Sequence, residues 1–113
     1  MSARVYKVNA TGSTAINATM VVPVGDNYRL VSVGVHFSVA PATSENFTVT
    51  LDANAGPAYD TLLYSLDVSA GSDTDVMWLP DEEIMLEGGD AIDVAFANSD
   101  SRTYGLQITM KAV

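Results

Sequence analysis

The sequence predicts an all-β fold, an antiparallel β-sandwich of about eight short strands. Three observations favour it. Apolar residues recur with a period of two along most of the chain, whereas few windows show an apolar stripe at helical spacing. The residues in these runs are largely β-branched or aromatic, which suits a half-buried pleated surface. Residues that form turns separate the runs at intervals of roughly 8–12 residues.

The clearest alternation runs from Leu30 to Val39, where every odd-numbered residue from Val31 onward is apolar. Four further runs alternate in the same way, at residues 47–52, 61–68, 92–97 and 106–111. Weaker strands are expected at residues 5–8, 15–22 and 76–79. Because successive side chains of a strand point to opposite faces, each run should bury its apolar parity in the core.

Gly, Pro, Asn and Asp gather between the runs, as at Pro23-Val-Gly-Asp-Asn and Glu87-Gly-Gly-Asp. Eight strands suit a jelly roll, in which two four-stranded sheets pack face to face. An immunoglobulin-type sandwich is the alternative, although its usual Cys and Trp pattern cannot occur in a chain without cysteine. We predict one domain over residues 1–113, with residues 1–12 as an N-terminal arm or an edge strand.

The charge balance disfavours two classes of partner. The formal net charge is −9, and no Lys or Arg occurs between Arg29 and Arg102. Such a surface repels phosphate backbones and anionic lipid, so we expect neither nucleic-acid nor membrane binding. Hydrophobic residues nevertheless make up 48% of the chain. That is more apolar material than one small core obviously needs, and an oligomer interface would account for the surplus.

Cysteine is absent, and the opening Met-Ser-Ala-Arg-Val-Tyr-Lys-Val has no apolar stretch of the secretory type. We therefore expect synthesis in the cytoplasm. No motif for a cofactor is recognisable, and we predict none.

Catalytic chemistry has little support. His36 is the only histidine and falls on the polar parity of its strand, where Ser32 and Ser38 are its neighbours in the chain but do not form a triad. We predict that the protein is not an enzyme and that His36 is a hydrogen-bonded structural or interface residue. An enzymatic alternative requires His36 beside an acid and a hydroxyl in a cleft.

A metal site has one weak candidate. Asp73 and Asp75 stand two residues apart, so in an extended segment their carboxylates point the same way and could share Ca²⁺. The full calcium-loop pattern is missing, and a solvated acidic turn is the alternative.

Two surfaces are candidates for assembly. Small residues share one parity of the strand at residues 91–97, so a second sheet or subunit could approach closely there. The N-terminal segment is cationic and aromatic and could add a strand to a neighbour. The interface candidates are Arg4, Tyr6, Lys7, His36, Ala91, Ala95 and Ala97.

The segment from Leu79 to Phe96, Leu-Pro-Asp-Glu-Glu-Ile-Met-Leu-Glu-Gly-Gly-Asp-Ala-Ile-Asp-Val-Ala-Phe, places the turn Leu-Glu-Gly-Gly-Asp before an alternating strand. Together with the final strand it resembles small jelly-roll proteins of tailed phages, the capsid decoration (cement) and head-fibre proteins. The resemblance covers residues 28–113 loosely, and tumour-necrosis-factor-like and carbohydrate-binding sandwiches share the turn. It implies attachment to a virion surface as an oligomer, and it carries no catalytic residue.

The leading hypothesis is therefore a virion structural protein that decorates a phage head as a homo-oligomer, expected to be a trimer, in contact with the major capsid protein or another virion protein. The alternative is a carbohydrate- or receptor-binding module. That alternative predicts exposed rings at Tyr28, Tyr59 or Tyr104, because sugar binding often uses an aromatic platform.

Overall fold

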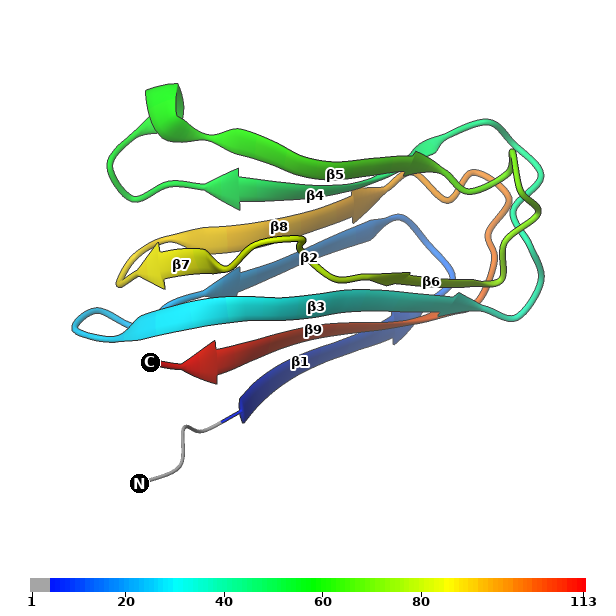
Figure 1. Ribbon diagram of the computed structural model, residues 1–113. Helices are drawn as coiled ribbons and strands as arrows, with labels where there is room; N and C mark the ends of the chain where they lie inside the picture. Colours follow the sequence, from blue (N-terminus) through cyan, green and yellow to red (C-terminus); the bar gives the residue numbers. More distant parts are fainter. Residues whose placement is uncertain (1–4) are drawn as a thin grey trace.

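The computed structural model describes residues 5–113, which form two antiparallel sheets packed face to face (Figure 1). The strands are β1 (Val5–Gly12), β2 (Ile16–Val21), β3 (Asn27–Phe37), β4 (Asn46–Asp52), β5 (Thr61–Asp67), β6 (Asp75–Trp78), β7 (Ile84–Glu87), β8 (Ala91–Phe96) and β9 (Tyr104–Ala112). A single 3₁₀ turn, η1 (Pro57–Tyr59), lies between β4 and β5. The predicted all-β antiparallel sandwich is confirmed.

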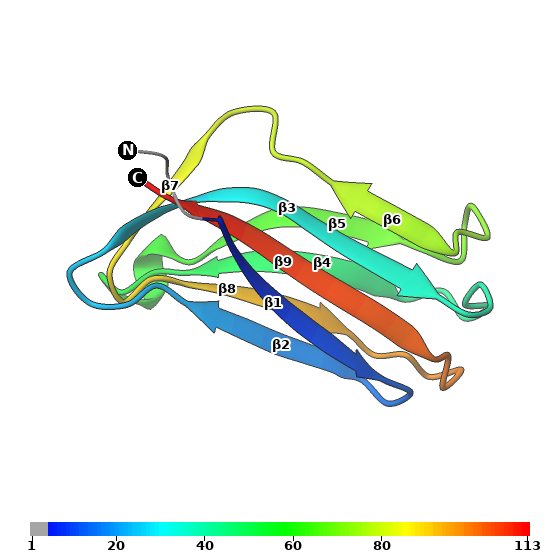
Figure 2. The same cartoon turned by 90° about the horizontal axis from the view of Figure 1, so that it is seen from below.

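Residues 5–113 contain nine strands where about eight were expected, and the strand order shows how the two numbers are related. Sheet A has the order β1-β9-β3, and both β6 and β7 pair with β3; sheet B has the order β2-β8-β4-β5. β6 pairs with Val33–His36 and β7 with Asn27–Leu30, so the two short strands follow one another along the same edge (Figure 2). Counted as one interrupted strand, they give the two four-stranded sheets of a jelly roll.

The interruption between β6 and β7 contains Pro80, which has no N–H to donate to a ladder. β7 itself was not predicted, because its four residues follow an acidic stretch and are too few to show a period.

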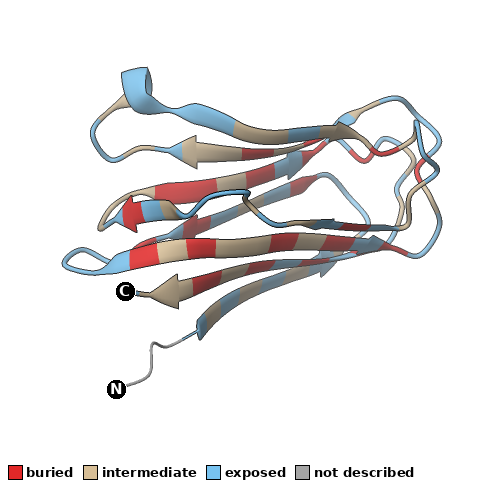
Figure 3. Cartoon of the chain, in the orientation of Figure 1, coloured by how far each residue is buried: buried red, intermediate tan, exposed pale blue. Residues whose placement is uncertain are grey.

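The core lies between the sheets. In most strands, the residues that it buries are the alternate residues that the sequence predicted. In β9, Leu106, Ile108 and Met110 are fully buried, whereas the residues between them face outward (Figure 3). Each large apolar side chain buried in this way contributes about 1.5–3 kcal/mol.

At two β-bulges, the residues that face the core differ from those predicted. In β3, Leu30 pairs with Met110 and Ser32 with Thr109, so Val31 has no partner and Leu30 takes the inward position. Val39 lies beyond the end of β3 and is exposed. Between β4 and β5 the register shifts after Val49, and Leu62 therefore faces solvent instead of the core.

β1 is an edge strand of the chain's own sheet, since it pairs with β9 from Val5 to Gly12. Its even-numbered residues face the core, where the Tyr6 ring stacks on Tyr28 with centroids 4.8 Å apart. Lys7 is on the outward parity and exposed. Arg4 lies outside the described residues.

In residues 5–113 there is no helix of the length and apolar character needed to cross a membrane.

Candidate interaction surface

The outer face of sheet A brings together side chains from four strands. Cross-strand pairing places Thr11, Gly105, His36 and Asp75 in one row across β1, β9, β3 and β6. Because side chains repeat every second residue, the neighbouring row on the same face consists of Asn9, Gln107, Gly34 and Met77.

These two rows line a shallow groove of about 520 Å³. Its two glycines differ in what lies above them. A Cβ on Gly34 would approach the Met77 Cε to 2.9 Å, so the methionine covers this glycine. A Cβ on Gly105 would meet no heavy atom within 4 Å, and the backbone is therefore bare at this point of the floor.

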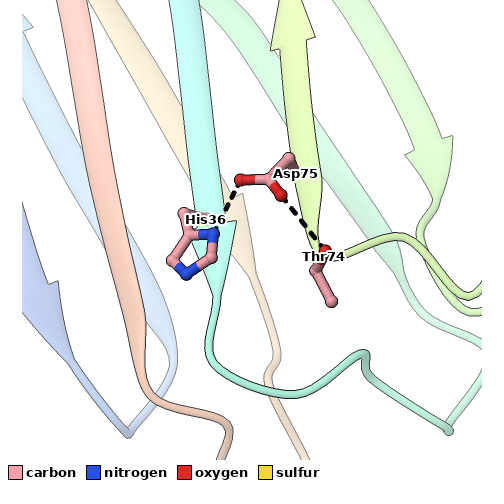
Figure 4. Close-up of polar contacts among 3 residues, drawn as sticks. All are labelled: His36, Thr74 and Asp75. Carbon is pink, nitrogen blue, oxygen red and sulfur yellow. Dashed lines mark hydrogen bonds and ion pairs between the residues drawn. The ribbon is translucent and has the colours of Figure 1, made fainter.

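His36 and Asp75 form an exposed pair at one end of the groove (Figure 4). The His36 Nδ1 lies 2.6 Å from the Asp75 Oδ1, and the Thr74 hydroxyl donates to the other carboxylate oxygen at 3.1 Å. The hydrogen bond with His36, followed by that from Thr74, holds the pKa of the Asp75 carboxyl below its usual range. The pair therefore joins the end of β3 to the start of β6.

A hydrolase triad needs a different arrangement of the same groups, because its hydroxyl must face the ring nitrogen that the acid does not hold. The Thr74 hydroxyl instead faces the carboxylate, and the Thr11 hydroxyl donates to the Tyr104 carbonyl at 2.8 Å. The hydrogen bond to Asp75 therefore fixes the His36 imidazole on the surface of the sheet.

The cations of sheet A lie on the same outer face, toward the other end of its strands. Arg29 pairs with Lys111 across β3 and β9, and Lys7 lies on the adjoining strand β1. The Arg29 guanidinium forms an ion pair with Glu83, which precedes β7. Within residues 5–113, the structure records no ion pair for Lys7 or Lys111.

The predicted interface residues fall on two different faces. Lys7 and His36 are on the outer face of sheet A, whereas Ala95 is exposed on the outer face of sheet B. Ala91 is buried, and Ala97 is exposed just beyond the end of β8. Tyr6 contacts the core and is half-buried. The alanines therefore do not form one continuous exposed stripe.

The two predicted metal ligands have separate surroundings. Asp75 is held by His36 and Thr74, while Asp73 lies in the turn before β6 against Gly71. The described part of the chain contains no group of three or more His, Cys, Asp or Glu residues placed to hold a metal ion.

The sugar-binding alternative predicted an exposed aromatic ring at one or more of three positions. Two of these three rings are buried. Tyr28 and Tyr104 are 4% and 8% exposed because both side chains point into the sandwich. Tyr59 is 64% exposed on η1, which connects two strands of sheet B, and it is not one of the groove residues. Among residues 5–113, no aromatic residue lines the groove.

Sequence reasoning missed the groove itself, including Asn9, Gln107 and Met77. One signal was present, because Gly105 directly precedes the alternating run at residues 106–111 and shares its polar parity, and glycine inside a strand often marks a close approach of another backbone or ligand.

Comparison with known proteins gives a likeness of fold. No protein-family model and no curated protein matches the chain. A chain in the acidic stable capsid structure of Helicobacter pylori bacteriophage KHP30 superposes with a TM-score of 0.50 at 11% identity, over 97% of this chain and 94% of that one. A crystal structure of Aeromonas hydrophila PliG, a periplasmic inhibitor of g-type lysozyme, gives a TM-score of 0.37 at 14% identity, over 96% and 86% of the two chains. The chain thus shares its fold, nearly end to end, with a phage capsid component.

Proposed function

We propose that this chain is a non-enzymatic structural protein of a virion that attaches to the surface of a phage head and stabilises or decorates the shell. The observation that carries the proposal is the end-to-end likeness in fold to a chain of the phage KHP30 capsid structure. The likeness extends over 97% of this chain and 94% of that one, so it concerns nearly all of both chains.

The surface supports the same function through its chemistry. A binding role needs broad exposed faces with groups that can be satisfied by a partner, and the outer face of sheet A offers amides, hydroxyls and cations on rigid strands. A net charge of −9 keeps such a protein soluble before assembly. The mechanism is passive: apolar and polar surface is removed from water at each contact.

We propose further that the protein acts as a homo-oligomer, with three subunits as the expected number, and that its other partner is the major capsid protein or another virion protein. The exposed apolar residues of sheet A, Val5, Met77 and Met85, support a partner on this sheet.

Immunogold electron microscopy tests the location. Antibodies raised against the purified chain are applied to intact particles from a phage lysate of the organism that carries the gene. We expect gold on the head surface. Antibodies that label no particles, or only tails, would show that head decoration is not the function, and preimmune serum serves as the control.

A further inference from the structure

The strongest asymmetry of the molecule is the division of charge across sheet A. Lys7 and Lys111 lie on β1 and β9, at one side of the sheet. The opposite edge carries the β6–β7 connection, residues 79–83, in which Asp81, Glu82 and Glu83 are all exposed. Glu83 is already paired with Arg29, so Asp81 and Glu82 are the acids of this connection that can face a partner.

Nothing in the described part of the chain, residues 5–113, explains the bare floor at Gly105. Glycine inside a strand costs about 0.5–1 kcal/mol relative to alanine. No neighbouring atom excludes a side chain from Gly105, and its backbone is not in the left-handed region. A glycine at such a position fits the close approach of another chain.

The acidic connection also carries apolar surface. Leu79 is 60% exposed at its start, and Met77 and Met85 are exposed on the short strands that flank it. Leu79 therefore lies next to carboxylates at one edge of sheet A, whereas the two lysines lie on its other side, with Lys7 two residues from the groove residue Asn9.

The charge pattern decides which sides of two such copies can meet. A contact that sets the same side of sheet A of both copies together would bring Lys7 and Lys111 against the same lysines of the second copy, and like charges in contact are unfavourable. A head-to-tail contact instead joins the cationic side of one copy to the acidic edge of the next. Repeated with rotation, that contact closes a ring.

We propose that the outer face of sheet A is the docking site for a second copy of this chain. Leu79 of one copy enters the groove over Gly105 of the next, and Asp81 and Glu82 pair with Lys7 and Lys111. Charge complementarity between the two edges of the same sheet carries the choice of occupant. The inference rests on the self-assembly in the proposed function and names its contact.

Light scattering coupled to size exclusion measures the assembly, at low salt and at about 0.15 M salt. We expect the wild type to have a mass of about three times 11.9 kDa, and added salt to weaken the association. The variants Lys7→Glu/Lys111→Glu and Asp81→Lys/Glu82→Lys should each run as monomers. The variant that combines all four reversals should assemble again, because it restores the complementarity with opposite sign.

A matched control is Asp52→Lys/Asp60→Lys, which makes the same charge change as Asp81→Lys/Glu82→Lys at exposed acids that border strands of sheet B and should keep the wild-type mass. Gly105→Val is a further variant, since it fills the groove at a position with room for a side chain. It should raise the dissociation constant by about tenfold or more. Far-UV circular dichroism shows that each variant is folded.

A wild-type monomer at all concentrations overturns the inference, as does a combined variant that fails to reassemble. If the charge variants keep their mass but no longer bind phage particles, the occupant of this face is a shell protein and the inference is wrong. If assembly follows the charges but antibodies label no particles, the contact stands and the virion function fails.

Discussion

At the scale of single residues, Asn98 has the most demanding position among the polar side chains. It is 3% exposed and has a φ of 52°. Its amide donates to the carbonyls of Thr14 and Arg102, and its side-chain oxygen accepts from the Arg102 N–H at 3.0 Å. Asparagine tolerates the left-handed region better than most residues, so one residue supplies both the turn and its hydrogen bonds.

We expect Asn98→Ala to lower the free energy of unfolding by about 1–3 kcal/mol, because the partners of a buried amide are left unsatisfied. Urea denaturation measures the loss. Asn98→Gly is the matched control, since glycine accepts the backbone conformation but not the hydrogen bonds. If the glycine variant is as stable as the wild type, the backbone conformation and not the amide is what matters.

Exposed carboxylates make stability depend on pH. Backbone and hydroxyl hydrogen bonds from Thr43 lower the pKa of Asp100, and hydrogen bonds from Ser44 and Ser69 lower that of Asp67. A carboxyl whose pKa is lower in the folded state stabilises above its unfolded value of about 3.9, and this contribution is lost as the pH falls through the folded value.

The melting temperature should therefore fall as the pH is lowered below about 4. Asp100→Ala should melt below the wild type at pH 6, and the gap between the two proteins should close in strong acid. Circular dichroism melts across this range test it. A gap that stays constant with pH would mean that the Asp100 charge contributes nothing.

A substitution at Gly105 distinguishes an effect on the stability of the chain from an effect on binding. Gly105→Ala should raise the free energy of unfolding by about 0.5–1 kcal/mol, because strand glycine is costly and the added Cβ has room. Denaturant titration of the dilute protein provides the value. A destabilised variant would show that the chain itself requires glycine here.

At the scale of elements, strand β9 shows what alternation predicts well. Ile108 is fully buried at its centre, and its neighbour Thr109 points to the outer face. Ile108→Ala should cost about 2–5 kcal/mol, the usual range for a large side chain removed from a core. Thr109→Ala should change stability by less than about 0.5 kcal/mol, and similar losses in both would contradict the assigned parity.

The errors in predicting which residues are buried also arise at the scale of strands. Val31 and Leu62 were assigned to the core from local alternation, yet each lies where a bulge shifts the register. A bulge depends on the partner strand, which a single run of residues does not contain. Tyr28 and Tyr104, whose rings the sugar-binding alternative requires to be exposed, are buried between the two sheets, and a single run of residues does not contain the opposing sheet either.

At the scale of the whole molecule, the period of two along the chain predicted the fold class, but it did not predict the site. Counting charges gave an acidic chain, but only the pairing of the first strand with the last brings Lys7 near Lys111. His36 was placed on an exposed face by its parity, whereas its partner Asp75 comes from a strand far along the chain. The groove consists of residues from four strands, and its shape therefore depends on the complete topology.

We propose that this fold works as a part of a virion. Quantitative mass spectrometry of phage particles purified by density gradient tests this role by comparing the abundance of this chain with that of the shell protein. We expect a fixed ratio to the shell protein that does not change on further purification. A chain that is abundant in the lysate but lost from the purified particles would contradict it.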